Sequence, residues 1–346
     1  SAFGNAGQKC SACSLLLVER SVYEDKNFQD KLKDAATSMK VGSVWNPGNV
    51  VGPMITNKND KLLKALELEK GESWLVPPRF LDKHKYVLAP TVKWGVRPGN
   101  YSFRTELFGP MLSVVCIENL QQGINWVNSL DYGLTSGLQS LDEGEQKLWK
   151  DSIMAGNLYI NRGITGAIVN RQPFGGMKLS AFGGGVKAGG PNYCACFVKI
   201  TDKLGSTTDY TQSYVKAYEQ EFAHARDVNN LYGEQNAFRY LPLKNMVLRL
   251  FPGDNNEDAK MIALAARICH TPLSISFEPG DDRTAALASL GCPLKEEALA
   301  GFLKSMKNYE RIRTCGADIP MEMYEEAARI DKYIATAKPV KDGRVE

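Results

Sequence analysis

A cysteine beside a lysine is the first group in the chain whose chemistry stands out. Cys10 lies in the segment Gly-Gln-Lys-Cys-Ser at residues 7–11, directly after Lys9. A thiol attacks an electrophile only as the thiolate, and a neighbouring cation lowers the thiol pKa toward neutral pH. These residue types indicate a nucleophilic cysteine, and the alternative is a small buried thiol that only fills space.

Two loop-forming segments further along combine polar and aromatic side chains with glycine and proline. Glu-Leu-Phe-Gly-Pro occupies residues 106–110, and Gln-Pro-Phe-Gly-Gly occupies residues 172–176. Proline fixes φ, while glycine permits positive φ or the close approach of another backbone. Each segment, taken alone, predicts a loop with strict backbone demands rather than a particular chemistry.

The chain has eight cysteines, but their pattern is not typical of a metal site or of a disulfide framework. Cys-x-x-Cys begins at Cys10 and Cys-x-Cys begins at Cys194, yet the three histidines are isolated. The two further ligands that zinc requires are therefore missing. Cysteines spread along a long chain for which we expect no secretory leader favour free thiols in a reducing compartment. We expect a cytoplasmic protein without a metal site.

Composition excludes several classes of protein. The 346 residues suggest about two domains, and 43% hydrophobic with 23% charged residues is typical of an ordered globular chain. A formal net charge of +3 is too balanced for a nucleic-acid or anionic-membrane partner. The longest apolar runs, such as residues 15–18, are far shorter than the ~20 residues of a transmembrane segment, and we expect no signal peptide.

The first 200 residues alternate strand-like and helix-like segments, which must position the reactive residues. Short apolar runs predict strands, and apolar residues at helical spacing predict helices. The expected strands are 15–18, 87–96, 112–117 and 158–160. The expected helices are 27–39, 62–68 and 120–130. This alternation is typical of an α/β fold with a mostly parallel sheet.

The character of the sequence changes after residue 200. Residues 201–211 are polar and contain Gly205, so we expect a linker there and a second domain over 212–346. The second domain is predicted to contain a strand, an amphipathic helix and a strand, over 246–251, 256–270 and 273–277. The first turn of this βαβ unit lacks a glycine fingerprint, and Asp254 would repel a phosphate. We expect a Rossmann-like domain without nucleotide binding.

Taken together and in this order, the segments resemble the catalytic domain of the aldehyde dehydrogenase superfamily over about residues 1–200. Four supporting segments match as well: Gly-Pro-Met-Ile at 52–55, Ala-Pro-Thr-Val at 89–92, Tyr-Gly-Leu-Thr-Ser-Gly at 132–137 and Gly-Asn-Leu-Tyr-Ile-Asn at 156–161. The resemblance implies a parallel sheet with flanking helices. It also implies that the segment 193–200 is a terminal strand used in subunit association, and hence a homo-oligomer.

Three segments narrow the resemblance to 1-pyrroline-5-carboxylate dehydrogenases: Gly-Gln-Lys-Cys-Ser-Ala at 7–12, Thr-Gly-Ala at 165–167 and Lys-Ala-Gly-Gly-Pro-Asn-Tyr at 187–193. These enzymes of proline catabolism oxidise L-glutamate γ-semialdehyde to glutamate with NAD⁺. The resemblance implies that Cys10 attacks the aldehyde to form a thiohemiacetal. Hydride transfer would then leave a thioester, which water hydrolyses, while the backbone N–H of Cys10 contributes to the oxyanion hole.

The resemblance also assigns the substrate contacts. Ser11 and the backbone N–H groups of Gly166 and Ala167 would hold the α-carboxylate of the semialdehyde. Phe174 would line the channel against the methylene groups, and Lys9 would favour both the thiolate and the carboxylate electrostatically. For Lys9 and Ser11 the alternative is ordinary polarity at a solvent-facing turn.

For the cofactor, the resemblance implies that Glu106 hydrogen-bonds the nicotinamide ribose of NAD and that Phe108 packs beside the ring. The NAD-binding domain, the general-base glutamate and the oxyanion asparagine of the superfamily precede the nucleophile. We therefore expect them to be absent from these 346 residues, and we expect the isolated chain to be inactive. FAD is expected only if a proline dehydrogenase domain lies upstream.

The second domain resembles the extra C-terminal region of bifunctional proline utilization proteins, on the segments Gly-Glu-Gln-Asn at 233–236 and Tyr-Leu-Pro at 240–242. Two alternatives to the assigned activity stay open. Arg171 stands where the family pattern suggests a small or uncharged residue, so an Arg-bound acidic aldehyde such as succinate semialdehyde is one alternative. The other is a non-catalytic assembly module.

Overall fold

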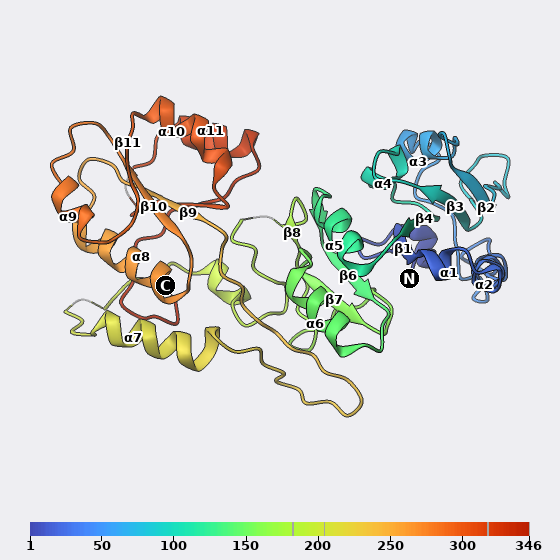
Figure 1. Cartoon of the computed structure of the whole chain (residues 1–346), viewed down its shortest axis with the longest axis horizontal. Helices are drawn as coiled ribbons and strands as arrows, with labels where there is room; N and C mark the ends of the chain where they lie inside the picture. Colours follow the sequence, from blue (N-terminus) through green and yellow to red (C-terminus); the bar gives the residue numbers. More distant parts are fainter. Residues whose placement is uncertain (182, 204, 317, 346) are drawn as a thin grey trace. The chain divides into compact units, whose positions relative to one another are not determined.

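The computed structural model describes residues 1–181, 183–203, 205–316 and 318–345. The chain forms two compact units, one of residues 1–167 and 174–181, the other of residues 168–173 and 182–346 (Figure 1). Each unit has its own sheet and its own hydrophobic core. The chain passes between the units within residues 167–182, upstream of the linker expected at 201–211, which stays a prediction.

The first unit is built on a four-stranded sheet in the order β1-β4-β3-β2. Its strands are β1 (Leu15–Glu19), β2 (Ser73–Val76), β3 (Thr91–Val96) and β4 (Met111–Ile117). β1, β4 and β3 pair in parallel, and β2 pairs with β3 antiparallel. Val114 and Val115 of β4 belong to different core clusters, so both faces of the sheet are covered. The strands predicted at 15–18 and 112–117 are confirmed.

The strand predicted over residues 87–96 is shorter than expected. Proline has no backbone N–H to donate to a ladder, and Pro90 separates the two halves of the segment. Leu88 forms only an isolated bridge with Phe80, and regular pairing begins at Thr91. The Thr91 N–H donates to the Pro110 carbonyl at 3.0 Å. The sheet thereby fixes the end of the 106–110 loop.

Four of the six α-helices of the first unit begin at side-chain caps. They are α1 (Arg20–Tyr23), α2 (Lys26–Thr37), α3 (Asp60–Ala65), α4 (Tyr101–Arg104), α5 (Leu120–Asn128) and α6 (Glu143–Ser152). Asp25, Asn59, Asn119 and Asp142 each accept a hydrogen bond from the first turn of α2, α3, α5 and α6 respectively. The helices predicted at 27–39 and 120–130 are confirmed, and the helix predicted at 62–68 is found at 60–65.

Short strands complete the first unit around α5 and α6. They are β5 (Tyr132–Gly133), β6 (Thr135–Leu138), β7 (Asn157–Ile160) and β8 (Met177–Lys178). β6 pairs with β7 in parallel and β5 pairs with β8 antiparallel. Ile124, Trp149 and Ile153 form the core beneath them. β7 is the strand predicted at 158–160.

The second unit contains a five-stranded, fully parallel sheet in the order β11-β10-β9-β12-β13. Its strands are β9 (Met246–Arg249), β10 (Leu273–Phe277), β11 (Leu294–Glu296), β12 (Arg311–Arg313) and β13 (Ile334–Ala335). Its helices are α7 (Tyr210–Ala217), α8 (Asn256–Ile268), α9 (Thr284–Ala288), α10 (Leu299–Ser305) and α11 (Met321–Arg329). The β9-α8-β10 unit confirms the predicted βαβ unit.

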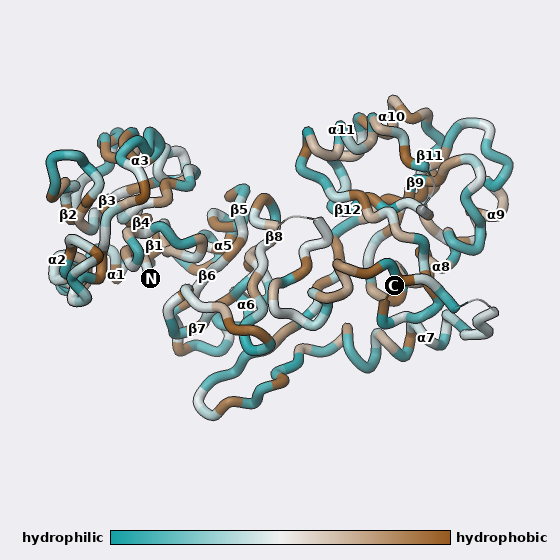
Figure 2. The backbone as a smooth tube through the Cα atoms, turned by 180° about the vertical axis from the view of Figure 1, so that it is seen from behind, coloured by the Kyte–Doolittle hydropathy of each residue, from teal (hydrophilic) through white to brown (hydrophobic). Residues whose placement is uncertain are grey.

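Two cores lie on opposite faces of this parallel sheet. Leu248 of β9 packs with residues of α8 and α9, whereas Val247 packs with residues of α10 and α11. Figure 2 shows the hydrophobic colouring running through these central strands. Because neighbouring strand residues point to opposite faces, helices must cover both sides, as in doubly wound α/β folds.

The terminal strand expected over residues 193–200 is absent from the described part of the chain. Tyr193–Phe197 forms a 3-10 helix, in which the Ala195 N–H donates to the Asn192 carbonyl at 3.2 Å. A strand forms only when a neighbour supplies hydrogen-bonding partners, and here the backbone bonds locally instead. Cys194 and Cys196 therefore do not share a strand face. Phe197 is left 75% exposed.

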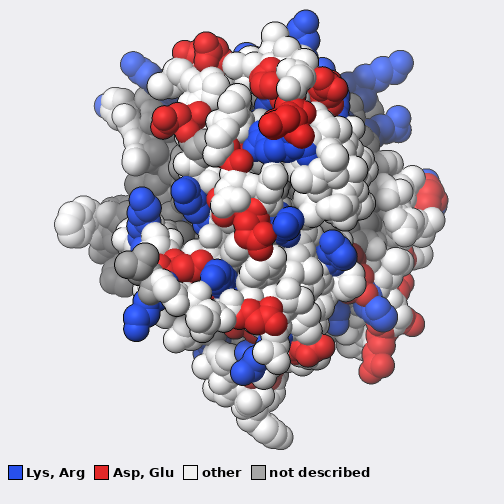
Figure 3. All heavy atoms as spheres, turned by 90° about the vertical axis from the view of Figure 1, so that its left-hand side faces the viewer, with Lys and Arg blue, Asp and Glu red and all other residues white. Residues whose placement is uncertain are grey.

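The surface charge agrees with the balanced composition. On the face drawn in Figure 3, basic and acidic side chains are interspersed. Among the described residues, no helix has the length and apolar content needed to cross a bilayer.

Candidate active site

Cys10 lies on an exposed turn next to a buried serine. The turn follows the 3-10 helix Gly4–Gly7, and the Ala12 N–H donates to the Lys9 carbonyl at 2.9 Å. The side chains of Cys10 and Lys9 are exposed, whereas Ser11 is 4% exposed. The turn therefore presents a thiol to solvent beside a cation, an environment that suits a nucleophile.

The Cys10 turn is held against the 106–110 loop by glycine and glutamine. A Cβ added to Gly7, which has φ +66°, would lie 2.2 Å from the Gly109 carbonyl oxygen, so only glycine permits this approach. Gln8 donates through Nε2 to the Phe108 carbonyl at 3.2 Å and accepts at Oε1 from the Ile55 N–H at 2.9 Å. Two segments that are distant in the sequence, one at Ile55 and one at 106–110, thus contact the Cys10 turn.

Glu106 and Phe108 lie on a loop that is hydrogen-bonded to the start of α3. Asn59 caps α3 by accepting from the Leu62 N–H at 3.1 Å and donates through Nδ2 to the Leu107 carbonyl at 2.8 Å. Glu106 Oε1 accepts from the Phe108 N–H at 3.1 Å, and Phe108 has φ +48°. The Phe108 side chain is 42% exposed. A carboxylate and an aromatic ring are therefore both accessible on one rigid loop.

Phe174 lies in a turn that packs against β7. The Gly175 N–H donates to Asn157 Oδ1 at 3.1 Å. A Cβ added to Gly156 would lie 1.9 Å from the Gly175 carbonyl oxygen, so the two backbones touch. The half-buried Phe174 ring thus comes from a turn that the start of β7 holds in place.

Gly166 and Ala167 follow β7 and are linked to the start of the chain. The Gly166 carbonyl accepts from the Tyr159 hydroxyl at 2.6 Å. The Ile164 N–H donates to Ser1 Oγ at 3.3 Å, and the Ser1 carbonyl accepts from the Cys13 N–H at 3.4 Å. Ser1 therefore bonds both the segment before Gly166 and the segment after Cys10.

Sequence reasoning missed the residues that assemble these loops. Gln8 and Asn59 hydrogen-bond backbone groups of distant segments. No sequence motif indicates such a contact. Asn59 had a usable signal, because an asparagine before an apolar helical run is a typical N-cap. For Gln8 the signal was only its presence in the nucleophile segment.

Solvent exposure divides the cysteines into three exposed thiols and five that are half-buried or buried. All eight are free, and Cys10, Cys194 and Cys196 are the exposed ones. Burial raises the pKa of Cys13, whose Sγ donates to the Leu15 carbonyl at 3.2 Å. Burial also raises the pKa of Cys315 to about 12. A raised pKa leaves less thiolate at neutral pH and so disfavours reaction.

We expect limiting iodoacetamide to modify Cys10 before any other cysteine. The Cys10 thiol is exposed on a turn beside Lys9, whereas burial raises the pKa of Cys13 and Cys269. Peptide mapping by mass spectrometry measures the order of labelling, with exposed Cys194 as the internal comparison. Earlier labelling of Cys13, Cys194 or Cys269 would contradict the prediction.

Comparison with known proteins identifies the family of the first 202 residues. The sequence model of the aldehyde dehydrogenase family matches residues 1–202. The chain belongs to the aldehyde dehydrogenase family. A 1-pyrroline-5-carboxylate dehydrogenase of Geobacillus is 34% identical over 195 residues, which are 56% of this chain and 37% of that protein. A Bacillus subtilis protein of the same name is equally similar, with the same coverage. The chain thus spans little more than a third of these family members.

Solved structures extend the likeness beyond the family domain. Proline utilization A from Corynebacterium freiburgense is 36% identical with a TM-score of 0.80, covering 99% of this chain and 35% of that one. A 1-pyrroline-5-carboxylate dehydrogenase from Thermus, solved with bound NAD, is 34% identical with a TM-score of 0.52, covering 57% of this chain and 38% of that one. The first likeness includes the second unit, which lies mostly beyond the family match.

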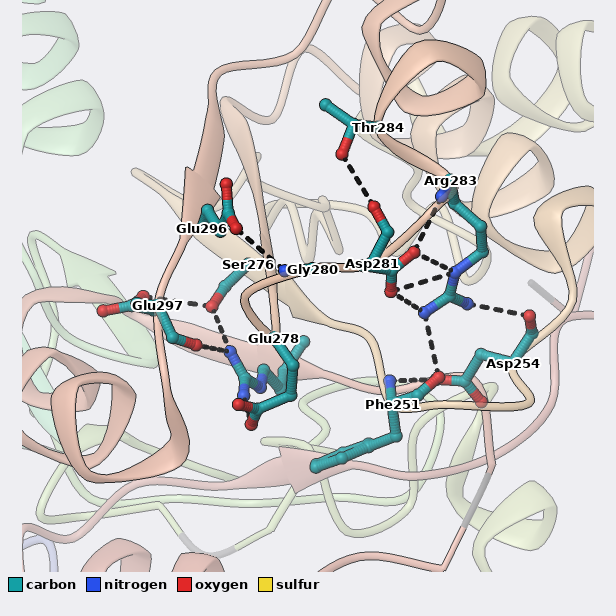
Figure 4. Close-up of polar contacts among 11 residues, drawn as sticks. Phe251, Asp254, Ser276, Glu278, Gly280, Asp281, Arg283, Thr284, Glu296 and Glu297 are labelled. Carbon is teal, nitrogen blue, oxygen red and sulfur yellow. Dashed lines mark hydrogen bonds and ion pairs between the residues drawn. The ribbon is translucent and has the colours of Figure 1, made fainter.

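The second unit has a polar cluster of its own at the carboxyl ends of β9 and β10 (Figure 4). Arg249 is fully buried, donates to Ser276 Oγ at 2.8 Å and to the Glu297 carbonyl at 2.9 Å, and pairs with Glu278. Arg283 pairs with Asp281 and donates to the Phe251 carbonyl at 3.0 Å. Arg249 and Arg283 thus hold the loops that follow β9, β10 and β11 through these contacts.

The turn after β9 supports the expectation that it does not hold a phosphate. The Phe251 N–H donates to Asp254 Oδ2 at 2.7 Å, so a carboxylate already occupies a backbone donor of this turn. Burial raises the pKa of Asp254. An anion placed here would meet a carboxylate instead of the free N–H groups that a phosphate site supplies.

Proposed function

We propose that the chain is the catalytic part of an NAD-dependent L-glutamate γ-semialdehyde dehydrogenase of proline catabolism, followed by an accessory domain. The observation that carries the proposal is the contact of the Cys10 turn with the 106–110 loop through Gly7 and Gln8. Relatives named 1-pyrroline-5-carboxylate dehydrogenase support the substrate. The coverage of proline utilization A supports a place within a longer bifunctional protein.

In the proposed reaction, the Cys10 thiolate forms a bond to the aldehyde carbon, and the carbonyl π electrons move to oxygen. The backbone N–H of Cys10 stabilises that oxyanion. NAD⁺, when bound, supplies the hydride acceptor. As the hydride leaves carbon, the C=O bond re-forms and a thioester on Cys10 results. Water then adds to the thioester carbon, the C–S bond breaks, and glutamate leaves.

The substrate contacts are proposed as the resemblance assigns them. Ser11 and the N–H groups of Gly166 and Ala167 hold the α-carboxylate, Lys9 adds positive charge, and Phe174 packs against the methylenes. The bond from the Tyr159 hydroxyl to the Gly166 carbonyl supports a fixed orientation for the Ala167 N–H, which lies in the same peptide plane. A fixed orientation is what recognition by backbone donors requires.

The cofactor contacts fit the residues present. Glu106 is exposed and acceptor-only when ionised, so it suits the two hydroxyls of a ribose. The Phe108 ring is exposed beside it and offers an apolar face. Glu106 and Phe108 would hold the nicotinamide ribose and ring. FAD is part of the proposal only for a proline dehydrogenase domain elsewhere in the same protein.

An acidic aldehyde bound by Arg171 is the less favoured alternative. The Arg171 guanidinium is paired with Glu234 and also donates to it through Nε at 2.6 Å. A guanidinium already neutralised by a carboxylate is a poor anchor for a second one. The free thiols support a reducing compartment, and we retain the cytoplasmic location and the homo-oligomer as parts of the proposal.

The test compares the 346-residue chain with the full-length protein. We expect the full-length protein to form NADH from glutamate γ-semialdehyde with kcat/KM at least ~10-fold above succinate semialdehyde. We expect no NADH from the chain alone, because it spans 37% of relatives such as the Geobacillus enzyme. NADH formation by the chain at the full-length rate, or a preference for succinate semialdehyde, would contradict the proposal.

A further inference from the structure

The turn between Ala167 and Phe174 is closed by its own backbone hydrogen bonds. The Gln172 N–H donates to the Ile168 carbonyl at 2.7 Å, and the Ile168 N–H donates to the Gln172 carbonyl at 3.3 Å. Residues 168–173 group with the second unit, although peptide bonds join them on both sides to the first. The turn therefore connects the two proposed substrate-binding segments directly.

A second closed loop, residues 226–238, lies within the same unit. Arg226 and Phe238 exchange both backbone hydrogen bonds at 2.8 Å. The Asp227 carboxylate accepts from the Asn236 N–H at 2.8 Å and from the Asn230 N–H at 3.1 Å. These bonds lower the pKa of Asp227, with Asn236 the largest cause. The loop is thus cross-linked from inside and can act as a rigid support.

The two loops are bonded to each other by matched side chains. Arg171 Nε donates to Glu234 Oε1 at 2.6 Å, and the guanidinium and carboxylate form an ion pair. Gln172 Nε2 donates to Asn236 Oδ1 at 3.1 Å. Asn236 Nδ2 in turn donates to Glu234 Oε1 at 3.0 Å. The side chains of Arg171 and Glu234 are 34% and 26% exposed, so the pair is largely shielded from water.

We propose that Glu234 is a positioning residue that fixes the 168–172 turn and, through it, the substrate-binding groups of Ala167 and Phe174. The inference rests on the proposed function. Backbone N–H groups recognise a carboxylate only at hydrogen-bond distance, and a displacement of ~1 Å costs up to ~100-fold in such a site. Glu234 and Asn236 bond two adjacent residues of the turn and so restrict its rotation as well as its position.

The first experiment measures the turn itself in the 346-residue chain. Glu234→Gln keeps the shape of the side chain and removes its charge, and Glu322→Gln at an exposed position of α11 is the matched control. We expect hydrogen exchange of the amides in residues 168–175 to become at least ~5-fold faster in Glu234→Gln and to stay unchanged in the control. Unchanged exchange in both variants overturns the proposal.

The second experiment measures kinetics in the full-length protein. We expect Glu234→Gln to raise KM for glutamate γ-semialdehyde ~10-fold with kcat within about twofold, because carboxylate binding is loosened while Cys10 is untouched. The exchanged pair Arg171→Glu with Glu234→Arg should restore most of the KM. Faster exchange without a change in KM overturns the proposal. If the unmodified protein does not oxidise the semialdehyde, the proposed function fails, and the inference that rests on it is overturned whatever the exchange rates.

Discussion

Replacing Cys10 with alanine is expected to lower kcat of the full-length protein in the proposed reaction by at least roughly 1,000-fold. In the proposed reaction every turnover forms and breaks a bond to Cys10 Sγ, so no other group replaces the thiol. The turn that carries Cys10 is held by backbone and Gln8 contacts, not by the thiol. The fold should therefore survive the substitution. NADH formation with saturating semialdehyde measures the loss.

The matched control is Cys194→Ala, because Cys194 is also exposed and free. We expect it to retain kcat within about twofold of the unmodified protein. Mass spectrometry of the unmodified protein, quenched during turnover, should find the acyl adduct on the peptide that contains Cys10. A Cys10→Ala protein that keeps a tenth or more of the activity, or an adduct on another cysteine, would contradict the assignment of the nucleophile.

Local patterns predicted the elements of the fold whose residues carry both periodicity and end signals. β4 and the β9-α8-β10 unit follow their apolar patterns, and α8 begins after a capping Asn255. The expected strand at 193–200 failed because extended structure depends on a partner that the segment's own residues cannot specify. Its residues bond locally among the described residues instead.

In the candidate site, too, local residue patterns predict some features, whereas contacts between distant residues are not predicted. Residue types predict the Cys10 turn and the 106–110 loop, because glycine and proline impose local backbone conformations. The pairing of Arg171 with Glu234 was not found, because two residues distant in the chain carry no mutual signal in one sequence. The sequence therefore predicts a substrate carboxylate as the partner of Arg171, whereas the structure pairs it with Glu234 of the same chain.

The buried pair Lys93–Glu72 carries the largest expected effect on stability. Lys93 of β3 is 1% exposed and the Glu72 side chain is 0% exposed, with 2.8 Å between Nζ and Oε2. Lys93 also donates to the Glu67 carbonyl at 2.7 Å. We expect Lys93→Met to lower the free energy of unfolding of the first unit by about 3–5 kcal/mol, because it leaves a buried carboxylate without its cation.

Tryptophan fluorescence in a urea titration of the 346-residue chain reports this unit selectively. All five tryptophans of the chain lie in residues 45–149, within the first unit. We expect a clearly lower urea midpoint in Lys93→Met and little change in Lys147→Met, whose exposed lysine pairs with Asp151.

The double variant Lys93→Met with Glu72→Leu separates a buried charge from lost packing. It removes both charges, so it should recover part of the midpoint lost in Lys93→Met. A double variant less stable than Lys93→Met would mean that the ion pair itself, not the unpaired carboxylate, stabilises the sheet. A midpoint for Lys93→Met equal to that of Lys147→Met would contradict the burial of the pair. Because β3 bonds the end of the 106–110 loop through Thr91, a loosened sheet should also weaken NAD binding by the full-length protein.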